Sequence, residues 1–226
     1  MNLAIIPARI GSKRIKKKNI KNFKGKPLIY FSIKAAIKSK LFDEIIVSTD
    51  SKEIRKLALK FGASVPFLRP KSLSDDYTKT QDVIKHSLKY MEKFKTNPNY
   101  ICCIYPTAPM LNYRNIIKGY NKLKKKKYDF IFSASKFQSS VLRSFCFKNG
   151  KLSKLISKYM DKRSQNLPIY YYDVGQFYWA SKSTWMNKNI FSSKSNIIEI
   201  PVLQGFDLNT NEDWKNLIKL SKIYEI

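Results

Sequence analysis

A loop rich in cationic side chains follows the first apolar segment of the chain. The run Leu3 to Ile6 is too short for a helix and predicts a buried parallel strand. Gly11, just after it, permits backbone angles that turn amide N–H groups toward an anion. The cations that could share this anion are Arg9, Lys13, Arg14 and Lys18. Such a loop predicts a polyphosphate site, with a nucleoside triphosphate as the ligand.

The spacing of this loop excludes two common phosphate motifs. Gly11 is followed by Ser12 and Lys13 with no earlier glycine, so neither GxxxxGK[ST] nor GxGxxG is present. A solvated basic loop is the alternative, because lysine is abundant throughout the chain. The strand that leads directly into the loop favours a ligand site.

Oxygen-bearing side chains alternate near the other end of the chain, in FDLNTNEDW at 206–214. Asp207 and Asn209 are placed to bind Mg²⁺, which prefers oxygen ligands and commonly bridges a triphosphate. The alternative is a helix-capping box with Thr210 as the cap and Asp213 at the third helical position. Both interpretations can hold together.

Further polar residues follow predicted strands. Arg69 offers a planar cation that suits a phosphate or a cytosine edge, and the alternative is a surface arginine before a turn. Asp50 could serve a site or the loop architecture equally. Asp75 and Asp76 stand before a helix, which favours capping by at least one of them. Thr107 lies in a turn stiffened by two prolines, where it could contact a nucleotide.

The elements that must position these residues alternate between strands and helices. Strands are predicted at 3–7, 44–50, 64–68, 100–105 and 130–135, and helices at 27–40, 51–61, 79–94 and 112–126. This rhythm predicts an α/β fold with a mostly parallel sheet and helices on both faces. Ligands should therefore bind at the carboxyl ends of the strands.

The rhythm changes after residue 136. Residues 137–170 predict a β-hairpin insertion that turns at Asn149 and Gly150. The main fold should resume with strands at 175–180 and 196–202 and close with a helix at 210–224. The 226 residues are enough for one substantial core, so a single domain over 1–226 with this insertion is expected.

Composition narrows the function classes. No apolar stretch is long enough to cross a membrane, and the early charges do not fit a signal peptide, so a cytoplasmic protein is expected. Cys102, Cys103 and Cys146 form no CxxC pair and are predicted to be reduced core residues. His86 is the only histidine, which excludes a histidine-based metal cage or triad. The chemistry must come from carboxylates, cations and a hard metal.

The net charge raises the question of nucleic acid. It is +28, from 44 Lys and Arg against 16 Asp and Glu. The densest run, Lys124 to Lys127, falls where a helix should end, and cations are favourable there. The chain carries no recognisable nucleic-acid motif, so no nucleic-acid partner is expected. A non-catalytic polyanion-binding protein is the distant alternative.

Residues 5–19, IIPARIGSKRIKKKN, resemble the signature IPARxGSKxxxxKN of the CMP-sialic acid synthetase group. These cytidylyltransferases activate acidic nine-carbon sugars with CTP on a Rossmann-like nucleotidyltransferase fold. The resemblance implies Mg²⁺ as the cofactor, and it assigns Lys26 in GKPLI to the same loop. The residues that it places around the CTP phosphates and ribose are Arg9, Ser12, Lys13, Lys18 and Asn19.

Four further segments resemble the same family. The STD ending at Asp50 and the RP at Arg69 match motifs of the group. YPTAPML at 105–111 is similar to PTSPLR, although the arginine is replaced by Asn112 or displaced to Arg114, and Tyr105 stands where many members carry glutamine. FDLNTNEDW is similar to DIDTxEDW. It implies that Asp207 is the first metal carboxylate and that Asn209 replaces the second.

RSQNLP and DVGQFYW, within 162–180, separate the subfamilies. They resemble RSQDLP and DAGQFYW of pseudaminic acid cytidylyltransferases rather than RRQDLP and NGAIYI of several sialic acid synthetases. The resemblance implies that Gln176 and Tyr178 line the sugar pocket. Arg143 and Arg163 are its candidates for the sugar carboxylate, one supplied across a homodimer formed through the insertion. The alternative for GQFYWA is an aromatic buried strand.

The sequence thus predicts a Mg²⁺-dependent cytidylyltransferase that joins CTP to an acidic nine-carbon sugar, pseudaminic acid first. The sugar hydroxyl would attack the α-phosphorus while Lys13, Lys18 and Arg9 stabilise charge and Asp207 holds the metal. N-acetylneuraminic, legionaminic or octulosonic acid would be the alternative substrates. No general base is evident. Asp207 or metal-assisted deprotonation would have to serve.

Overall fold

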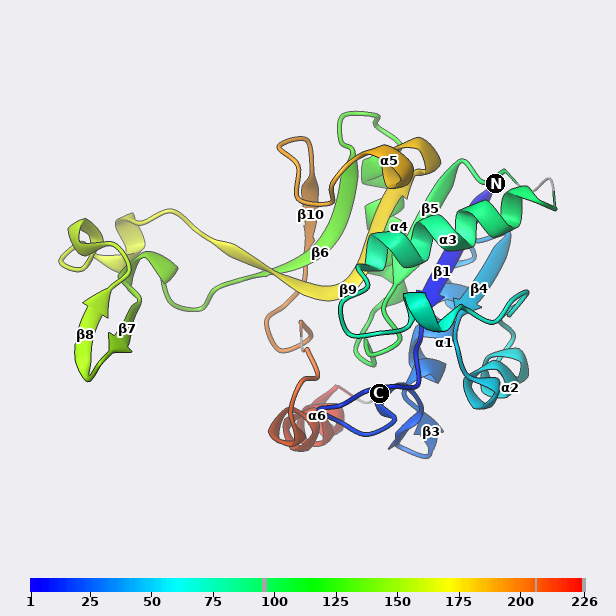
Figure 1. The fold of residues 1–226 in the computed structure, drawn as a ribbon. Helices are drawn as coiled ribbons and strands as arrows, with labels where there is room; N and C mark the ends of the chain where they lie inside the picture. The colour runs from blue at the N-terminus through cyan, green and yellow to red at the C-terminus, as the bar shows by residue number, and fades with distance from the viewer. Residues whose placement is uncertain (95–96, 206, 225–226) are drawn as a thin grey trace.

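A six-stranded sheet with helices on both faces forms the body of the protein (Figure 1). The computed structural model describes residues 1–94, 97–205 and 207–224. The sheet strands are β1 (Asn2–Pro7), β4 (Glu44–Ser48), β5 (Tyr100–Ile104), β6 (Phe130–Lys136), β9 (Tyr171–Ser181) and β10 (Asn196–Glu199). The helices are α1 (Ile29–Ser39), α2 (Lys52–Lys60), α3 (Thr80–Glu92), α4 (Tyr113–Leu123), α5 (Lys182–Asn187) and α6 (Asn211–Ile223).

The strand order is β10-β6-β9-β5-β1-β4. β1 pairs in parallel with β4 and β5, and β10 pairs in parallel with β6. β9 lies antiparallel between β5 and β6. The prediction of a mostly parallel α/β sheet is confirmed, with one long antiparallel strand at its centre.

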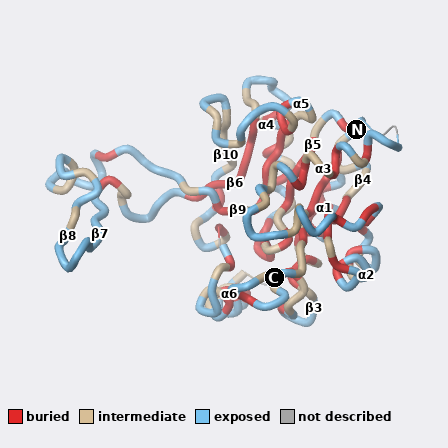
Figure 2. Tube along the Cα trace, viewed as in Figure 1, coloured by how far each residue is buried: buried red, intermediate tan, exposed pale blue. Residues whose placement is uncertain are grey.

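Alternating side chains of the buried strands supply two cores, one on each face of the sheet. Ile6 and Trp179 pack on the face covered by α1 and α4. Ile5 and Trp185 belong to the core on the face covered by α3 and α5. Figure 2 shows the buried residues concentrated in this central sheet. The body therefore offers a rigid frame whose strand ends can hold a site.

Residues 137–170, here called the arm, project away from the body between β6 and β9 (Figure 1). The predicted hairpin is confirmed by β7 (Phe145–Lys148) and β8 (Lys151–Lys154). Asn149 and Gly150 both have positive φ, 51° and 73°, as a two-residue type I′ turn requires. Cys146 is exposed on β7, so its prediction as a core residue was wrong. An isolated hairpin has no second layer to bury it.

The strand predicted at 64–68 was also wrong. Only isolated bridges form there, Ile46 with Ser64 and Thr49 with Leu68. Pro66 lacks the N–H that a continuous ladder would need. The other predicted elements are present, with ends displaced by a few residues.

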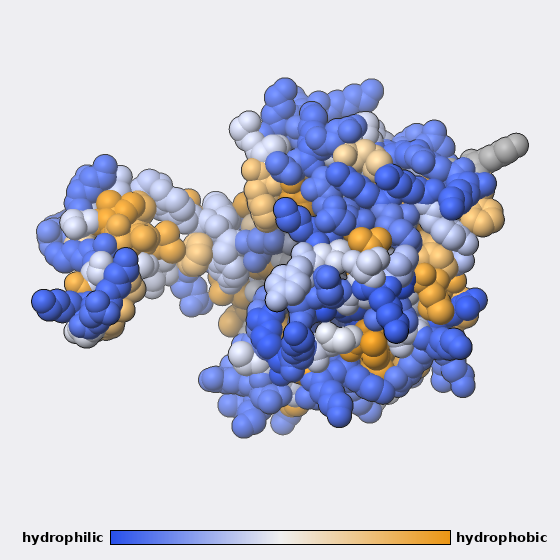
Figure 3. Space-filling model, in the orientation of Figure 1, coloured by the Kyte–Doolittle hydropathy of each residue, from blue (hydrophilic) through white to orange (hydrophobic). Residues whose placement is uncertain are grey.

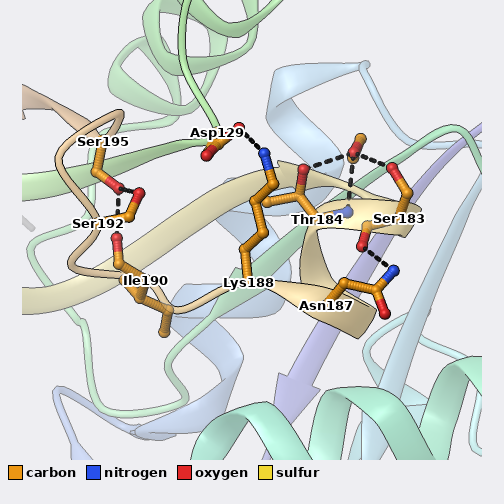
Figure 4. Close-up of polar contacts among 9 residues, drawn as sticks. Asp129, Ser183, Thr184, Asn187, Lys188, Ile190, Ser192 and Ser195 are labelled. Carbon is orange, nitrogen blue, oxygen red and sulfur yellow. Dashed lines mark hydrogen bonds and ion pairs between the residues drawn. The ribbon is translucent and has the colours of Figure 1, made fainter.

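Two short elements escaped prediction because they are too short to show a periodicity. One is the ribbon of β2 (Asn22–Phe23) and β3 (Lys26–Pro27), and the other is α5. Figure 4 shows the polar contacts around α5: Lys188 pairs with Asp129 at 2.8 Å, and the Ser181 hydroxyl accepts from the Thr184 N–H at 3.1 Å. Within the described residues, no helix is long and apolar enough to span a membrane.

Candidate active site

A cavity of about 530 Å³ opens beside the carboxyl ends of β1 and β5. We call residues 8–19 the basic loop and this space the basic-loop cavity. The predicted nucleotide residues that line it are Arg9, Ser12, Lys13, Lys18, Asn19, Arg69 and Thr107. Residues from three separate stretches of sequence thus converge where the parallel sheet was expected to bind its ligand.

Two side chains fix the shape of the basic loop. Asp50 accepts the Ile10 N–H through Oδ1 at 3.0 Å. Asn19 is buried, and its Nδ2 donates to the Arg9 carbonyl at 2.7 Å. Asp50 therefore serves the loop architecture, one of its two predicted roles, and Asn19 holds the loop that carries the cations.

Gly11 does not line the cavity, and its φ is not positive. A Cβ built on it would meet nothing within 4 Å. The expectation that Gly11 adopts a special backbone conformation was therefore wrong. The left-handed residue of the loop is Lys17, with φ 51°, a conformation that sequence does not reveal for a lysine.

Arg69 is 5% exposed and lies in the wall of the basic-loop cavity. Its Nε donates to the Ser74 hydroxyl at 3.1 Å, and its backbone N–H donates to the Thr49 carbonyl at 2.7 Å. Burial lowers the pKa of the guanidinium from its ordinary value, and the nearby Asp50 charge opposes that shift. The alternative of a surface arginine is therefore wrong. Arg69 is a buried cation in the wall of the cavity.

Asp76 places a negative charge across the mouth of this cavity. Its carboxylate contacts the Arg9 guanidinium and lies 2.7 Å from Lys13 Nζ. Hydrogen bonds from Lys13 and then Arg9 lower its pKa. Two of the cations predicted to bind phosphate are thus paired with a carboxylate.

Asp75 closes the turn that precedes α3 and does not cap the helix. Its Oδ1 accepts the N–H groups of Thr78 at 2.7 Å and Tyr77 at 3.0 Å. The cap position of α3 is Lys79, which makes no side-chain capping bond. The predicted capping of this helix by Asp75 or Asp76 was therefore wrong, because the turn adds residues between them and α3.

Lys18 connects the basic loop to the segment before α6. Its Nζ donates to the Leu208 carbonyl, beside Asp207. Burial lowers its pKa below the ordinary 10.5, and the Asp207 charge opposes that shift. A partly desolvated ammonium interacts strongly with an anion, which fits the predicted role of Lys18 in stabilising phosphate charge.

Asp207 lies on a second cavity of about 640 Å³, which also includes Asp173 and Lys219. Asn209 Nδ2 donates to Asp207 Oδ2 at 2.6 Å. Asp213 is occupied in the predicted capping box, where Oδ2 accepts the backbone N–H of Asn209 at 2.8 Å and of Thr210 at 2.6 Å. The capping interpretation is confirmed for Thr210 and Asp213, and the capping box does not use Asp207.

Gln176 and Tyr178, predicted to line the sugar pocket, are both buried. Gln176 Nε2 donates to the Gln204 carbonyl at 2.6 Å, while its Oε1 has no partner among the described residues. The Tyr178 ring packs on Phe132, and its hydroxyl donates to Asp173 Oδ2. Neither side chain is part of the two cavities, so Tyr178 acts on the second cavity through Asp173.

Arg143 and Arg163 lie on the arm and are exposed. Neither lines the basic-loop cavity or the second cavity. The structure therefore separates them from the other predicted site residues. Their role as ligands of the sugar carboxylate stays a prediction.

Sequence reasoning missed two lining residues of the basic-loop cavity. Thr80 opens α3, and its Oγ1 lies 2.7 Å from the Tyr105 hydroxyl. Burial raises the pKa of Tyr105 to about 12, so the phenol is neutral and can hydrogen-bond to a ligand. In the sequence, the only signal at Tyr105 was its difference from the glutamine of many family members. The only signal at Thr80 was its position near the start of a predicted helix.

The comparisons with known proteins agree with this geometry. The family model described as Cytidylyltransferase matches residues 3–219. A pseudaminic acid cytidylyltransferase of Campylobacter jejuni is 40% identical over 215 residues, which cover 94% of this chain and 92% of that protein. The CMP-N,N'-diacetyllegionaminic acid synthase of Legionella pneumophila is 30% identical, over 98% of this chain and 96% of that protein.

A solved structure supports the fold independently. A CMP:2-keto-3-deoxy-manno-octonic acid synthetase complexed with CTP superimposes with a TM-score of 0.73 at 16% identity, covering 100% of this chain and 99% of the other. At this identity the likeness shows the fold alone. The residues matched by the family model include both cavities and the arm, and the chain belongs to the cytidylyltransferase family.

Proposed function

We propose that this cytidylyltransferase couples CTP to pseudaminic acid, an acidic nine-carbon sugar, and releases pyrophosphate. The observation that carries the proposal is the 40% identity over 94% of the chain to a protein named for that reaction. The basic-loop cavity supports it, because three cations and a buried arginine surround a space suited to a nucleoside triphosphate.

The protein's own residues divide the work between two cavities. In this proposal Arg9, Lys13 and Lys18 bind the triphosphate, and Arg69 and Thr107 contact the nucleoside. The sugar hydroxyl attacks the α-phosphorus, the bond to the β-phosphate oxygen breaks, and pyrophosphate leaves. Lys18 stabilises the charge that develops, because it lies at the junction of the two cavities.

Mg²⁺ is the proposed cofactor, and the side chains near Asp207 are the candidates to bind it. No group of three or more metal-binding side chains occurs in the described part of the chain. Asp207 can nevertheless supply carboxylate oxygen, and Mg²⁺ often takes its other ligands from phosphates and water. The Asn209 amide directs its Nδ2 at Asp207, so its oxygen would join the same ion only after the amide turns over. Such an ion neutralises triphosphate charge. These residues fit a metal that the substrate helps to bind.

We further propose a homodimer in the cytoplasm, where CTP is available. The arm supports the dimer because its large apolar side chains lie in solvent in the single chain (Figure 3). These residues are Phe145, Phe147, Leu152, Leu155 and Ile169. Arg143 and Arg163 would then reach the sugar of a partner subunit.

Pyrophosphate release is the test of the proposed function. The enzyme is assayed with CTP and Mg²⁺ alone and then with pseudaminic, N-acetylneuraminic or legionaminic acid. Release with pseudaminic acid alone is expected. Release with another sugar would overturn the proposed substrate but not the proposed reaction. The relative named for a legionaminic acid derivative makes legionaminic acid the first alternative. No release with any acidic sugar would overturn the proposal.

Asp207→Ala tests the metal assignment. Turnover should fall at least 100-fold, while binding of a polyanion such as heparin stays unchanged. Glu212→Ala, an exposed carboxylate of α6, is the matched control and should keep normal turnover. Normal turnover of Asp207→Ala would show that the metal site is elsewhere. Binding of polyanions without any turnover in the wild type would favour the non-catalytic alternative, which the charge of +28 motivates.

A further inference from the structure

We propose that Asp173 is a specificity residue that contacts the acidic sugar and accepts a hydrogen bond from one of its hydroxyl or amide groups. The inference rests on the proposed function and deepens it, because it names the group that orients the sugar. Asp173 opens the motif DVGQFYW, yet neither the triphosphate nor the metal assignment uses it.

The Asp173 carboxylate is held rigidly from both oxygens. Oδ2 accepts the O–H of the buried Tyr178, and Oδ1 accepts the Gly175 N–H at 2.9 Å. Gly175 has φ +59°, a left-handed conformation that suits glycine, at a bulge where the pairing of β6 with β9 shifts register. An ionised carboxylate has about four acceptor sites, so two remain for a ligand.

The position of Asp173 is next to the reaction centre. Asp173 lines the second cavity together with Asp207 and Lys219. Lys18, which lines the basic-loop cavity, bonds to the Leu208 carbonyl beside Asp207. A sugar in the second cavity would therefore lie beside the phosphates of a nucleotide in the first.

The support behind Asp173 extends through two aromatic rings to the basic-loop cavity. The Tyr178 ring lies 5.4 Å, between centroids, from the ring of Tyr105. The Tyr105 hydroxyl reaches Thr80, and both of these residues line the basic-loop cavity. The Tyr178 hydroxyl thus anchors the Asp173 carboxylate, and the Tyr178 ring lies beside Tyr105 of the basic-loop cavity. This support fixes the direction of the carboxylate before the sugar binds.

Charge decides which part of the sugar Asp173 faces. Among the described residues, no cation lies within ion-pair distance of Asp173. Burial against its surroundings raises its pKa, and the Asp207 charge adds to that effect. Asp173 is exposed on the second cavity, so an uncharged donor can reach its carboxylate, whereas the sugar carboxylate would be repelled. Lys219, on the same cavity, offers that carboxylate a counter-charge.

Asp173→Asn tests the inference by steady-state kinetics with pseudaminic acid and CTP varied separately. A hydrogen bond to a charged group contributes about 1.5–3 kcal/mol, which predicts a rise of roughly 10- to 100-fold in the KM for the sugar. The KM for CTP should stay within about twofold. The ratio of kcat/KM for pseudaminic acid over N-acetylneuraminic acid should also fall. A purely structural role would not change this ratio selectively.

Two further variants make the result decisive. Tyr178→Phe keeps the ring but removes the hydroxyl that holds Asp173, so it should raise the same KM by a smaller factor and add little to Asp173→Asn. It also carries the test if Asp173→Asn does not fold. Asp129→Asn, which loses a remote ion pair, is the matched control and should leave both KM values unchanged.

The failures of the two proposals are distinguishable. If the wild type releases pyrophosphate with pseudaminic acid and Asp173→Asn has unchanged sugar KM and selectivity, this inference alone is overturned. Equal rises in the KM values for CTP and sugar would also overturn it, because they would assign Asp173 a general structural role. If the wild type uses no acidic sugar, the proposed function itself fails.

Discussion

The basic-loop cavity and the arm differ in how completely one chain builds them. The cavity gathers side chains at the ends of parallel strands, and several are held by a second residue: Asp50 holds the basic loop, and Ser74 holds the buried Arg69. All four residues of β7 are exposed, and the arm's arginines lie outside both cavities. One chain therefore forms the whole basic-loop cavity, whereas the apolar side chains of the arm stay exposed in the single chain.

The largest effect should come from the residue that joins the two cavities. Lys18→Met should lower kcat by about 10²- to 10³-fold, the usual loss when one donor to a developing negative charge is removed. Lys17→Met, which removes an exposed partner of Glu53, is the matched control and should change kcat less than threefold. Pyrophosphate release measures both. Equal losses in the two variants would show that the loop acts through its total charge rather than through Lys18.

The arm should respond differently from the cavity. Phe147→Lys combined with Leu155→Lys should dissociate the dimer and lower sugar turnover by about 10- to 100-fold, because charges in an apolar interface are costly. The Kd for CTP should stay within about threefold. Sedimentation measures the oligomeric state, pyrophosphate release measures sugar turnover, and calorimetry measures the Kd for CTP. Leu59→Lys, an exposed leucine of α2, should change none of them.

A smaller effect should follow from the carboxylate at the cavity mouth. Asp76→Asn should tighten CTP binding about two- to fivefold at low salt. In the wild type, Arg9 and Lys13 must give up their ion pairs with Asp76 before they bind the CTP phosphates, and the variant removes this competition. Titration calorimetry measures the change, and added salt should reduce it. Glu92→Gln, which breaks a remote ion pair with Lys182, serves as the control. Weaker CTP binding in Asp76→Asn would show that Asp76 positions the cations instead of competing for them.

The smallest effect concerns the helix that follows Asp207. Thr210→Ala should lower the free energy of unfolding by about 1 kcal/mol, the usual contribution of a threonine cap, and the melting temperature by about 2–4 °C. Thermal unfolding followed by circular dichroism measures both. Ser193→Ala, which changes an exposed hydroxyl outside any helix cap, provides the comparison. An unchanged melting temperature would mean that α6 does not need its capping box.

The pH dependence of this cap has a defined sign. Burial tends to raise the pKa of Asp213, but the N–H groups of Asn209 and Thr210 outweigh it and lower the pKa from 3.8. A depressed carboxyl pKa stabilises the fold above the unfolded value, and the contribution is lost as pH falls through the folded value. Asp213→Asn should therefore reduce the melting temperature at pH 7 but not near pH 2.

The sequence was informative where chemistry and periodicity coincide. The cations Arg9, Lys13 and Lys18 line one cavity, as predicted. They could be predicted because both the strand before them and the basic loop itself are visible as local patterns in the sequence. Gln176 and Tyr178 could not be placed, because the bulge in β9 breaks the alternation from which their direction would be read. Asp173 was missed for the same reason. Cys146 was misplaced because no local pattern distinguishes a hairpin in the core from one in solvent.

The attachment of the arm has a consequence for how such a fold can change. Lys136 at the end of β6 pairs with Tyr171 at the start of β9, and the Phe137 N–H donates to the Tyr170 carbonyl at 2.9 Å. Both ends of the arm thus leave from neighbouring rungs of one antiparallel ladder. A tight turn between β6 and β9 could replace the whole arm. The arm is therefore an insertion that can be lengthened, exchanged or lost without a change in the strand order of the sheet.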